Sequence, residues 1–138
     1  MLADERNLVL AAEKVIAMGP KTLVVKHGEY GATAFFSDRS VSGTKLSRPF
    51  RAPALPLAEV VDPTGAGDSF AGGFYGYLAS QPKLTPAVFR TAMFYGGVMG
   101  SFAVERFGTE RLQSLTREEI DERFNLFREI SHLEHAGV

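Results

Sequence analysis

The sequence lacks cysteine and tryptophan altogether, and it lacks any excess of charge of one sign. Without cysteine the chain has no disulfide and no thiolate metal site, which is typical of a cytoplasmic protein. Fifteen basic and sixteen acidic residues give a net charge of -1, so neither nucleic acid nor an anionic membrane is expected as a partner. No apolar run approaches the length of a membrane span, and residues 1–6 lack the apolar core of a signal peptide. We therefore expect a cytoplasmic location.

The chain is large enough for one domain, because 138 residues with 45% hydrophobic content can bury a core. Apolar periodicity and end signals predict four helices, at residues 4–18, from the small-residue turn near 65 to about 80, at 85–105, and from 117 onward. A hairpin is predicted from strands at 22–25 and 32–36, followed by one short strand within 37–48 and an extended edge segment at 50–56. These elements indicate one α/β unit with a helix-rich C-terminal half.

The sequence also predicts the surroundings of the first strand in the sheet. Thr22-Leu23-Val24-Val25 is a continuous apolar run of the kind that is buried in a parallel sheet. The helix, turn and strand of residues 4–25 are in the order of the second half of a βαβ unit, whose first strand would precede Met1. We therefore expect an open sheet edge and an exposed apolar face on this side of the molecule.

The most informative stretch is Asp62-Pro63-Thr64-Gly65-Ala66-Gly67-Asp68, where a strand-like segment turns into a helix. Backbone amides at a helix N-terminus that are not shielded by large side chains can bind an anion. A carboxylate at Asp68 would repel a phosphate in a site made only for binding. It is useful if it removes a proton from a hydroxyl that attacks phosphorus, so the stretch indicates phosphoryl transfer.

Two predicted helices carry unusually many interior glycines. The six are Gly72, Gly73 and Gly76 in the first helix and Gly96, Gly97 and Gly100 in the second. Each costs about 1 kcal/mol relative to alanine in a helix interior. Close packing between helices is one explanation, and close approach of the backbone to a bound nucleotide is the other.

The run from Asp62 to Asp68, followed by Gly72-Gly73, resembles the C-terminal signature of the PfkB/ribokinase family of carbohydrate and nucleoside kinases. Two further segments are similar to that family and occur in its order. They are the strand-turn-strand Val24-Val25-Lys26-His27-Gly28-Glu29-Tyr30-Gly31-Ala32 and the helix end Ser101-Phe102-Ala103-Val104-Glu105-Arg106-Phe107-Gly108. The resemblance covers residues 4 to 115 and implies a three-layer α/β/α ribokinase-like sandwich.

The family resemblance also implies roles for the residues of the signature. Asp68 matches the general base that deprotonates the acceptor hydroxyl as it attacks the γ-phosphate of ATP. Gly65, Ala66 and Gly67, together with the amide of Asp68, match the anion hole for the transferred phosphoryl group. The implied reaction is the ATP-dependent phosphorylation of a hydroxymethyl group on a sugar or nucleoside, with Mg²⁺ as the metal ion.

The flanking positions match binding residues of the same family. Asp62 and Thr64 match positions that help to hold a monovalent cation such as K⁺, with carbonyl groups of residues 103–109 completing the site. Outside the motif, Asp62 would be read as a turn or capping aspartate instead. Residues of the turn after the first strand match the lining of the nucleotide pocket; these are Lys26, Gly28 and Gly31. Lys26 has an equally good interpretation as a solvated turn residue.

The sequence departs from the family in two ways. Members commonly carry an asparagine near the adenine, where this chain has Gly97. Complete members are also about twice as long, so residues 1–138 are interpreted as a single partial domain, the C-terminal half without the lid and first strands. Two functions therefore remain open: a sugar or nucleoside kinase, or an inactive remnant that binds nucleotide or oligomerises. Self-association, or pairing with a missing N-terminal half, is expected.

Overall fold

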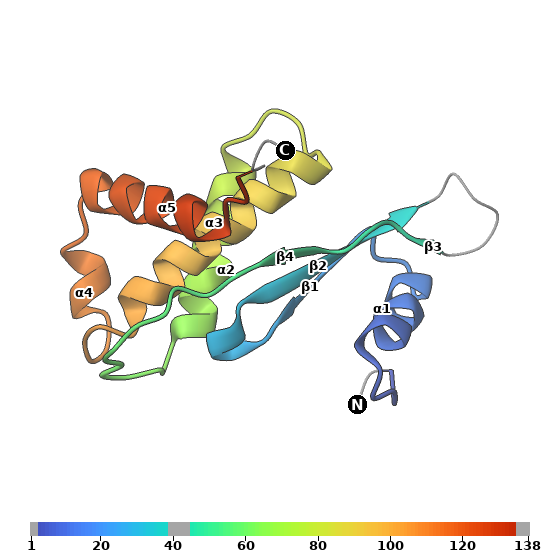
Figure 1. Ribbon diagram of the computed structural model, residues 1–138, viewed down its shortest axis with the longest axis horizontal. Coiled ribbons are helices and arrows are strands. Elements are labelled where there is room, and N and C mark those ends of the chain that lie inside the picture. Colours follow the sequence, from blue (N-terminus) through green and yellow to red (C-terminus); the bar gives the residue numbers. More distant parts are fainter. Residues whose placement is uncertain (1–2, 39–44, 135–138) are drawn as a thin grey trace.

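The computed structural model describes residues 3–38 and 45–134, and shows a small sheet with helices on both sides (Figure 1). The helices are α1 (Leu8–Ala17), α2 (Ala66–Ala79), α3 (Pro86–Ala103), α4 (Glu110–Gln113) and α5 (Arg117–Ser131). The strands are β1 (Thr22–Lys26), β2 (Ala32–Asp38), β3 (Lys45–Leu46) and β4 (Phe50–Ala52). None of the helices in these two ranges is long and apolar enough to cross a membrane.

Strand β2 is the centre of the sheet, and every pairing with it is antiparallel. It pairs with β1 along one edge, and with β4 and then β3 along the other. The predicted hairpin is confirmed, as is the short strand within 37–48, although residues 39–44 of that segment lie outside the described part. The predicted edge position of residues 50–52 is confirmed as well, since β4 pairs only with β2.

Among residues 3–38 and 45–134 no strand pairs in parallel with the first strand, and the expected parallel partner, which would precede Met1, stays a prediction. Strand β1 pairs antiparallel with β2 and has no partner on its other side among residues 3–38 and 45–134. Its apolar residues are only half-buried, because an edge strand is covered on one side alone. An open sheet edge is thus present where the sequence predicts one.

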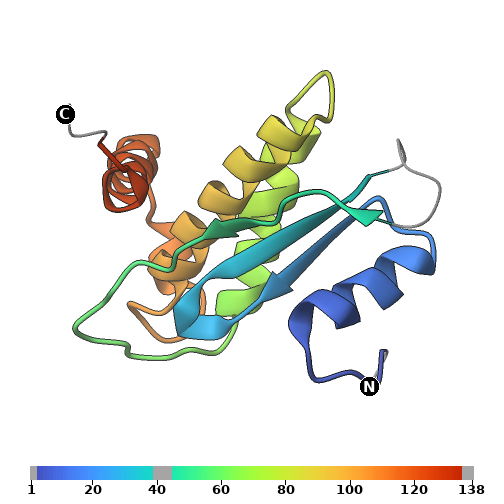
Figure 2. The same ribbon diagram turned by 45° about the vertical axis from the view of Figure 1, so that its right-hand side comes forward.

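The sheet lies between α1 on one face and the pair α2 and α3 on the other (Figure 2). Successive side chains of a strand point to opposite faces, and β2 is buried on both. Ala32, Ala34 and Phe36 belong to the core shared with α2 and α3. By the same alternation Phe35, also fully buried, points to the opposite face. The arrangement has the three layers that the sequence predicts.

Local sequence signals account for most of the helix ends. The side chain of Asn7 accepts hydrogen bonds from the amides of Val9 and Leu10, so α1 begins at Leu8, later than the predicted residue 4. Thr85 caps α3 in front of a proline at the first helical position. The capping box of Thr116 and Glu119 opens α5 as predicted.

A second small core joins α5 to α3. Its buried members are Val98, Phe102 and Phe127. Helix α3 ends at Ala103, slightly before the predicted residue 105. The short helix α4 is not predicted by the sequence, because four residues are too few to show helical periodicity.

Candidate functional site

A cavity lies between the β1–β2 turn, the segment that follows β4, and the facing ends of α2 and α3. Its volume is about 910 Å³, and most of its lining is apolar or backbone. Six of the sequence-predicted site residues line it: Lys26, Gly28, Gly31, Ala66, Gly67 and Gly97. The structure thereby brings together residues from three separate segments that the sequence can only order along the chain.

The residues from Asp62 to Asp68, hereafter the 62–68 turn, lead into α2. One oxygen of the Asp62 carboxylate accepts a hydrogen bond from the Thr64 amide at 2.9 Å, which folds the chain back on itself. Gly65 is the N-cap of α2 and has φ +79, a left-handed conformation that favours glycine. The first hydrogen bond of the helix runs from the Ser69 amide to the Gly65 carbonyl at 2.8 Å.

Three amides of the 62–68 turn donate to no acceptor in the described part of the chain: those of Gly65, Gly67 and Asp68. The Ala66 amide is engaged, since it donates to the carbonyl of Pro63 at 3.2 Å. Free amides at the positive end of a helix dipole form a site for an anion. The turn therefore has the donors that an anion hole requires, with Gly65, Gly67 and Asp68 free and Ala66 bonded.

Asp68 occupies the first turn of α2, beside these free amides, and its side chain is exposed. Its carboxylate has no ion pair or hydrogen bond with any residue that the structure describes. Asp68 does not line the cavity but lies next to Gly67, which does. An unpartnered carboxylate at the edge of an anion site can accept a proton from a group that approaches from solvent.

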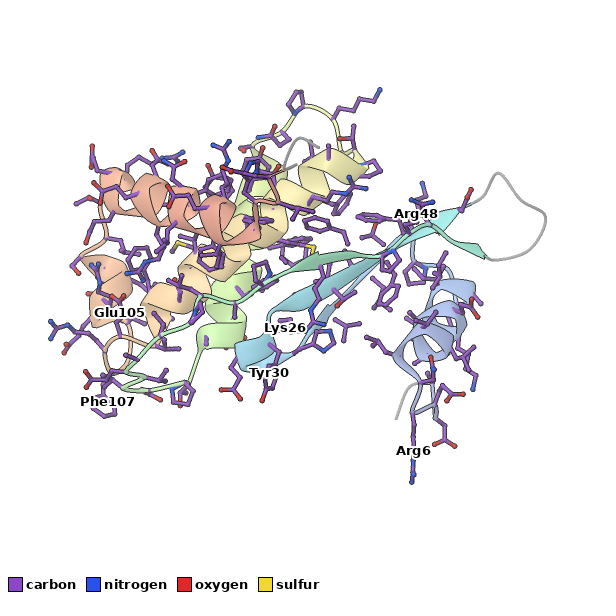
Figure 3. All side chains as sticks on the ribbon, in the orientation of Figure 1. Arg6, Lys26, Tyr30, Arg48, Glu105 and Phe107 are labelled. Carbon is purple, nitrogen blue, oxygen red and sulfur yellow. The ribbon has the colours of Figure 1, made fainter. Side chains whose placement is uncertain are left out.

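Lys26 brings a positive charge to the same place. Its Nζ donates to the carbonyl of Gly67 at 3.2 Å, across 41 positions of sequence. Figure 3 shows Lys26 at the end of the β1–β2 hairpin that faces α2. A Cβ atom at position 67 would lie 2.9 Å from this Nζ, so a small residue at 67 leaves room for the lysine. The hydrogen bond ties Lys26 to the start of α2, and its contact with a nucleotide stays a prediction.

The other predicted glycines that line the cavity are Gly28, Gly31 and Gly97, and a different physical reason favours glycine at each of them. Gly28 has φ +58 and Gly31 has φ +92, and a Cβ at Gly31 would come within 2.1 Å of the Ala52 carbonyl oxygen. At Gly97 a Cβ would lie 2.9 Å from the ring of Phe127 on α5. Gly97 is therefore a packing position as well as a lining residue, and its contact with a nucleotide stays a prediction.

The structure places Asp62 against the end of α3, as the predicted cation site requires. The Val104 carbonyl accepts from the amides of Val61 at 2.9 Å and Asp62 at 3.3 Å. Hydrogen bonds from the Thr64 amide and then the Thr64 hydroxyl, with a further one from the Gly108 amide, lower the pKa of Asp62. Its carboxylate stays ionised at neutral pH. Asp62, Thr64 and residues 104–108 lie together, and the cation stays a prediction.

Several lining residues escape sequence reasoning. Residues 53–57 form one wall of the cavity, and Tyr30 and Ser101 lie in others. The prolines at 53 and 56 are the available signal, because they indicate an extended segment that does not pair. Tyr30 lies between Gly28 and Gly31, in the turn that the family resemblance places at the nucleotide pocket, whereas no local signal singles out Ser101.

Comparison of the sequence with known proteins identifies the family to which the chain is similar. The model of the pfkB family carbohydrate kinases matches residues 2–115. The chain is 39% identical over 85 residues to a cytidine kinase of Thermococcus kodakarensis, covering 59% of this chain and 27% of that protein. It is 37% identical over 99 residues to an acarbose 7(IV)-phosphotransferase of Actinoplanes sp., covering 70% of this chain and 29% of the relative.

Solved structures of similar fold are also kinases. A Vibrio cholerae fructokinase with fructose, ADP and potassium ion bound has a TM-score of 0.73 at 17% identity, over 88% of this chain and 36% of its own. An aminoimidazole riboside kinase from Salmonella enterica has a TM-score of 0.65 at 26% identity, over 83% of this chain and 35% of its own. The chain thus spans about a quarter of the curated relatives that it matches. With the family model matching most of its residues, the chain belongs to the pfkB family of carbohydrate kinases.

Proposed function

We propose that this chain carries the phosphate-binding turn and the catalytic base of an ATP-dependent kinase that phosphorylates a hydroxymethyl group of a sugar or nucleoside. The observation that carries the proposal is the 62–68 turn. Three unpartnered amides and one unpartnered carboxylate lie within four residues, at the edge of a cavity of about 910 Å³. The kinases named above, which act on nucleosides and sugars, support this reaction class.

In the proposed reaction Asp68 accepts the proton of the acceptor hydroxyl. The hydroxyl oxygen forms a bond to the γ-phosphorus of ATP, and the bond from that phosphorus to the β,γ-bridging oxygen breaks, which releases ADP. The amides of Gly65, Gly67 and Asp68 stabilise the charge on the phosphoryl oxygens, as preorganised donors do. Lys26 adds a positive charge beside them.

The cofactors of the proposal are ATP with Mg²⁺, and K⁺ at the monovalent site. No group of three or more His, Cys, Asp or Glu that could hold a metal is found within residues 3–38 and 45–134. This fits Mg²⁺ held mainly through the nucleotide phosphates, where it neutralises charge. Asp62 and Thr64, with carbonyls of the 103–109 segment, would supply the oxygen atoms that hold K⁺.

An Asp68→Asn variant tests the assignment of the base. The change keeps the shape of the side chain and removes its ability to accept the proton, so we expect turnover to fall by a factor of about 100 to 10,000. The affinity for ADP, measured by titration calorimetry, should change little. Asp121→Asn on α5, away from the cavity, is the matched control and should leave both quantities unchanged. Turnover that survives in Asp68→Asn would exclude Asp68 as the base.

A second candidate function is a kinase remnant that binds nucleotide without catalysis. The chain spans about a quarter of the length of those curated relatives. The same calorimetry separates the two. Binding of ATP and Mg²⁺ with no turnover on any sugar or nucleoside would support the remnant, whereas turnover would support the kinase.

A further inference from the structure

A cluster of charged side chains lies at the C-terminal end of α3, next to the candidate site. The Glu105 carboxylate receives Arg111 Nε at 2.8 Å on one oxygen and Arg123 Nη1 at 2.6 Å on the other. Arg111 comes from α4 and Arg123 from α5, so Glu105 ties both helices to the end of α3. Figure 3 shows Glu105 just beyond α3, close to α4. The three side chains are only 18% to 27% exposed, so solvent screens these pairs less than ordinary surface pairs.

Other contacts hold the two arginines in place. The ring of Phe102 is fully buried and lies 3.5 Å from Arg123 Cζ and 4.8 Å from Arg111 Cζ. Arg111 also pairs with Glu119, the capping residue of α5, at 2.6 Å. Arg123 Nη1 donates to the hydroxyl of Ser101, which lines the cavity, at 3.3 Å. Each guanidinium thus has several partners that define one geometry.

The residue before Glu105 connects this cluster to the 62–68 turn. The carbonyl of Val104 accepts hydrogen bonds from the amides of Val61 and Asp62. Asp62 in turn accepts the Thr64 amide with its carboxylate. Beyond Thr64 lie the free amides of Gly65, Gly67 and Asp68. A continuous set of contacts therefore runs from α5 through Glu105 and Val104 to the amides of the anion site.

A second ion pair, within α5, is an exposed surface pair and serves as a comparison for the Glu105 cluster. Arg117 and Asp121 are paired at 3.1 Å, four residues apart on the same helix, with side chains that are 69% and 51% exposed. Arg117 also interacts with Tyr95 of α3, but both charged side chains are mostly exposed, so the contribution of the pair to stability should be small. The Glu105 cluster differs because it joins three helices and ends at the backbone that holds the 62–68 turn.

We propose that Glu105 and Arg123 are positioning residues, through which α5 sets the orientation of the free amides in the 62–68 turn. Arg123 lies beyond residues 2–115, the range that the family model matches. The ligand of these amides rests on the proposed function, but the positioning itself does not. The inference can therefore be tested with and without nucleotide.

The test compares Glu105→Gln and Arg123→Met with Arg117→Met, the matched control on the same helix. In the free protein, the amide resonances of Thr64, Gly67 and Asp68 should shift in the first two variants and stay in place in the control. The dissociation constant of ADP, measured by calorimetry well below the melting temperature, should rise about 3- to 30-fold in the first two variants alone. The loss of affinity in the double variant should be smaller than the sum of the two single losses, because both changes break the shared Glu105–Arg123 pair.

The outcomes separate this inference from the proposed function. A lower melting temperature with unmoved 62–68 resonances and an ADP affinity within twofold of the parent would overturn the inference and leave a purely structural pair. If the parent chain binds no ADP, the proposed function fails and the amide resonances alone decide on positioning. If Arg123→Met does not fold, Arg123→Lys replaces it. That variant keeps the charge but loses the planar stack on Phe102, and unmoved resonances in it and in Glu105→Gln would equally overturn the inference.

Discussion

The sequence allows two interpretations of Lys26, a nucleotide-binding residue or a solvated turn residue, and the structure adds one contact that bears on them. As part of a polar turn it could simply be solvated. In the structure its ammonium group lies 3.2 Å from the Gly67 carbonyl, at the mouth of the anion site. An ammonium group held there can also reach a phosphate that binds the neighbouring amides.

We expect Lys26→Met to weaken the binding of ADP about tenfold, which is the loss typical of one charge-assisted hydrogen bond. The difference from the parent chain should shrink as salt is added, because exposed charges are screened. Calorimetry at low and high ionic strength measures both effects. Lys21→Met, an exposed lysine just before β1, is the control. If Lys26→Met and the parent chain bind ADP with equal affinity at low salt, Lys26 is a solvated turn residue and does not contribute to binding.

At the scale of elements, the contact between α2 and α3 explains part of the glycine pattern. A Cβ at Gly73 would lie 2.6 Å from the Tyr95 carbonyl oxygen, and one at Gly96 would lie 2.9 Å from that of Phe70. At Gly72 and Gly76 a Cβ would meet nothing within 4 Å. Helix packing is therefore the reason for some of these glycines, whereas Gly72 and Gly76 have no packing reason and their approach to a nucleotide stays a prediction.

Two adjacent glycines of α2 give opposite predictions. Gly73→Ala places a methyl group against the backbone of α3, so it should lower the free energy of unfolding by about 1–3 kcal/mol, as overpacking does. Gly72→Ala meets open space and should raise that energy by up to about 1 kcal/mol, because alanine favours the helix. Urea denaturation of the two variants measures the difference. A Gly73→Ala variant as stable as Gly72→Ala would show that the helices can separate at no cost.

The elements themselves follow closely from sequence signals, and their ends follow from capping. Asn7, Thr85 and Thr116 each accept a hydrogen bond from the helix that they precede. The sequence does not predict α4, because four residues are too few to show helical periodicity.

At the scale of the whole molecule, charge pairs make stability depend on pH. Burial acts to raise the pKa of Glu105, but the hydrogen bonds and charges of Arg111 and Arg123 outweigh it and lower the pKa below the ordinary value of 4.5. Hydrogen bonds from Arg111 and from the Thr116 amide likewise lower the pKa of Glu119. A group with a lower pKa in the folded state binds protons more readily when unfolded. Its stabilisation is therefore complete above its ordinary pKa and is lost as pH falls through the folded-state value.

The melting temperature should accordingly stay nearly constant from pH 7 to about 5, and fall as the pH goes below 4.5. Thermal denaturation followed by circular dichroism across this range provides the measurement. In Glu105→Gln the melting temperature at pH 7 should be lower and its fall below pH 4.5 smaller, since one of the titrating groups is gone. An equally steep fall in the variant would show that the Glu105 cluster does not contribute to the acid sensitivity.

The unpaired edge of β1 bears on how the whole molecule can associate with another chain. Its backbone groups have no partner on one side in the described ranges, and α1 exposes the apolar side chains Leu8, Val9 and Leu10. An open strand edge is a template for pairing with another strand. Self-association, or pairing with a further part of a longer protein, stays a prediction.

The sequence by itself determined most of the elements and the local conformation of the 62–68 turn, because both depend on neighbours within a few residues. Gly65 permits the left-handed N-cap, small residues leave the amides uncovered, and Asp68 stands in the first turn of the helix. The tertiary structure alone decided what surrounds that turn. Contacts between distant segments bring Lys26 to Gly67, Phe127 to Gly97, and the Glu105 cluster to the backbone behind Asp62. Such contacts depend on how whole elements pack, which no local pattern encodes.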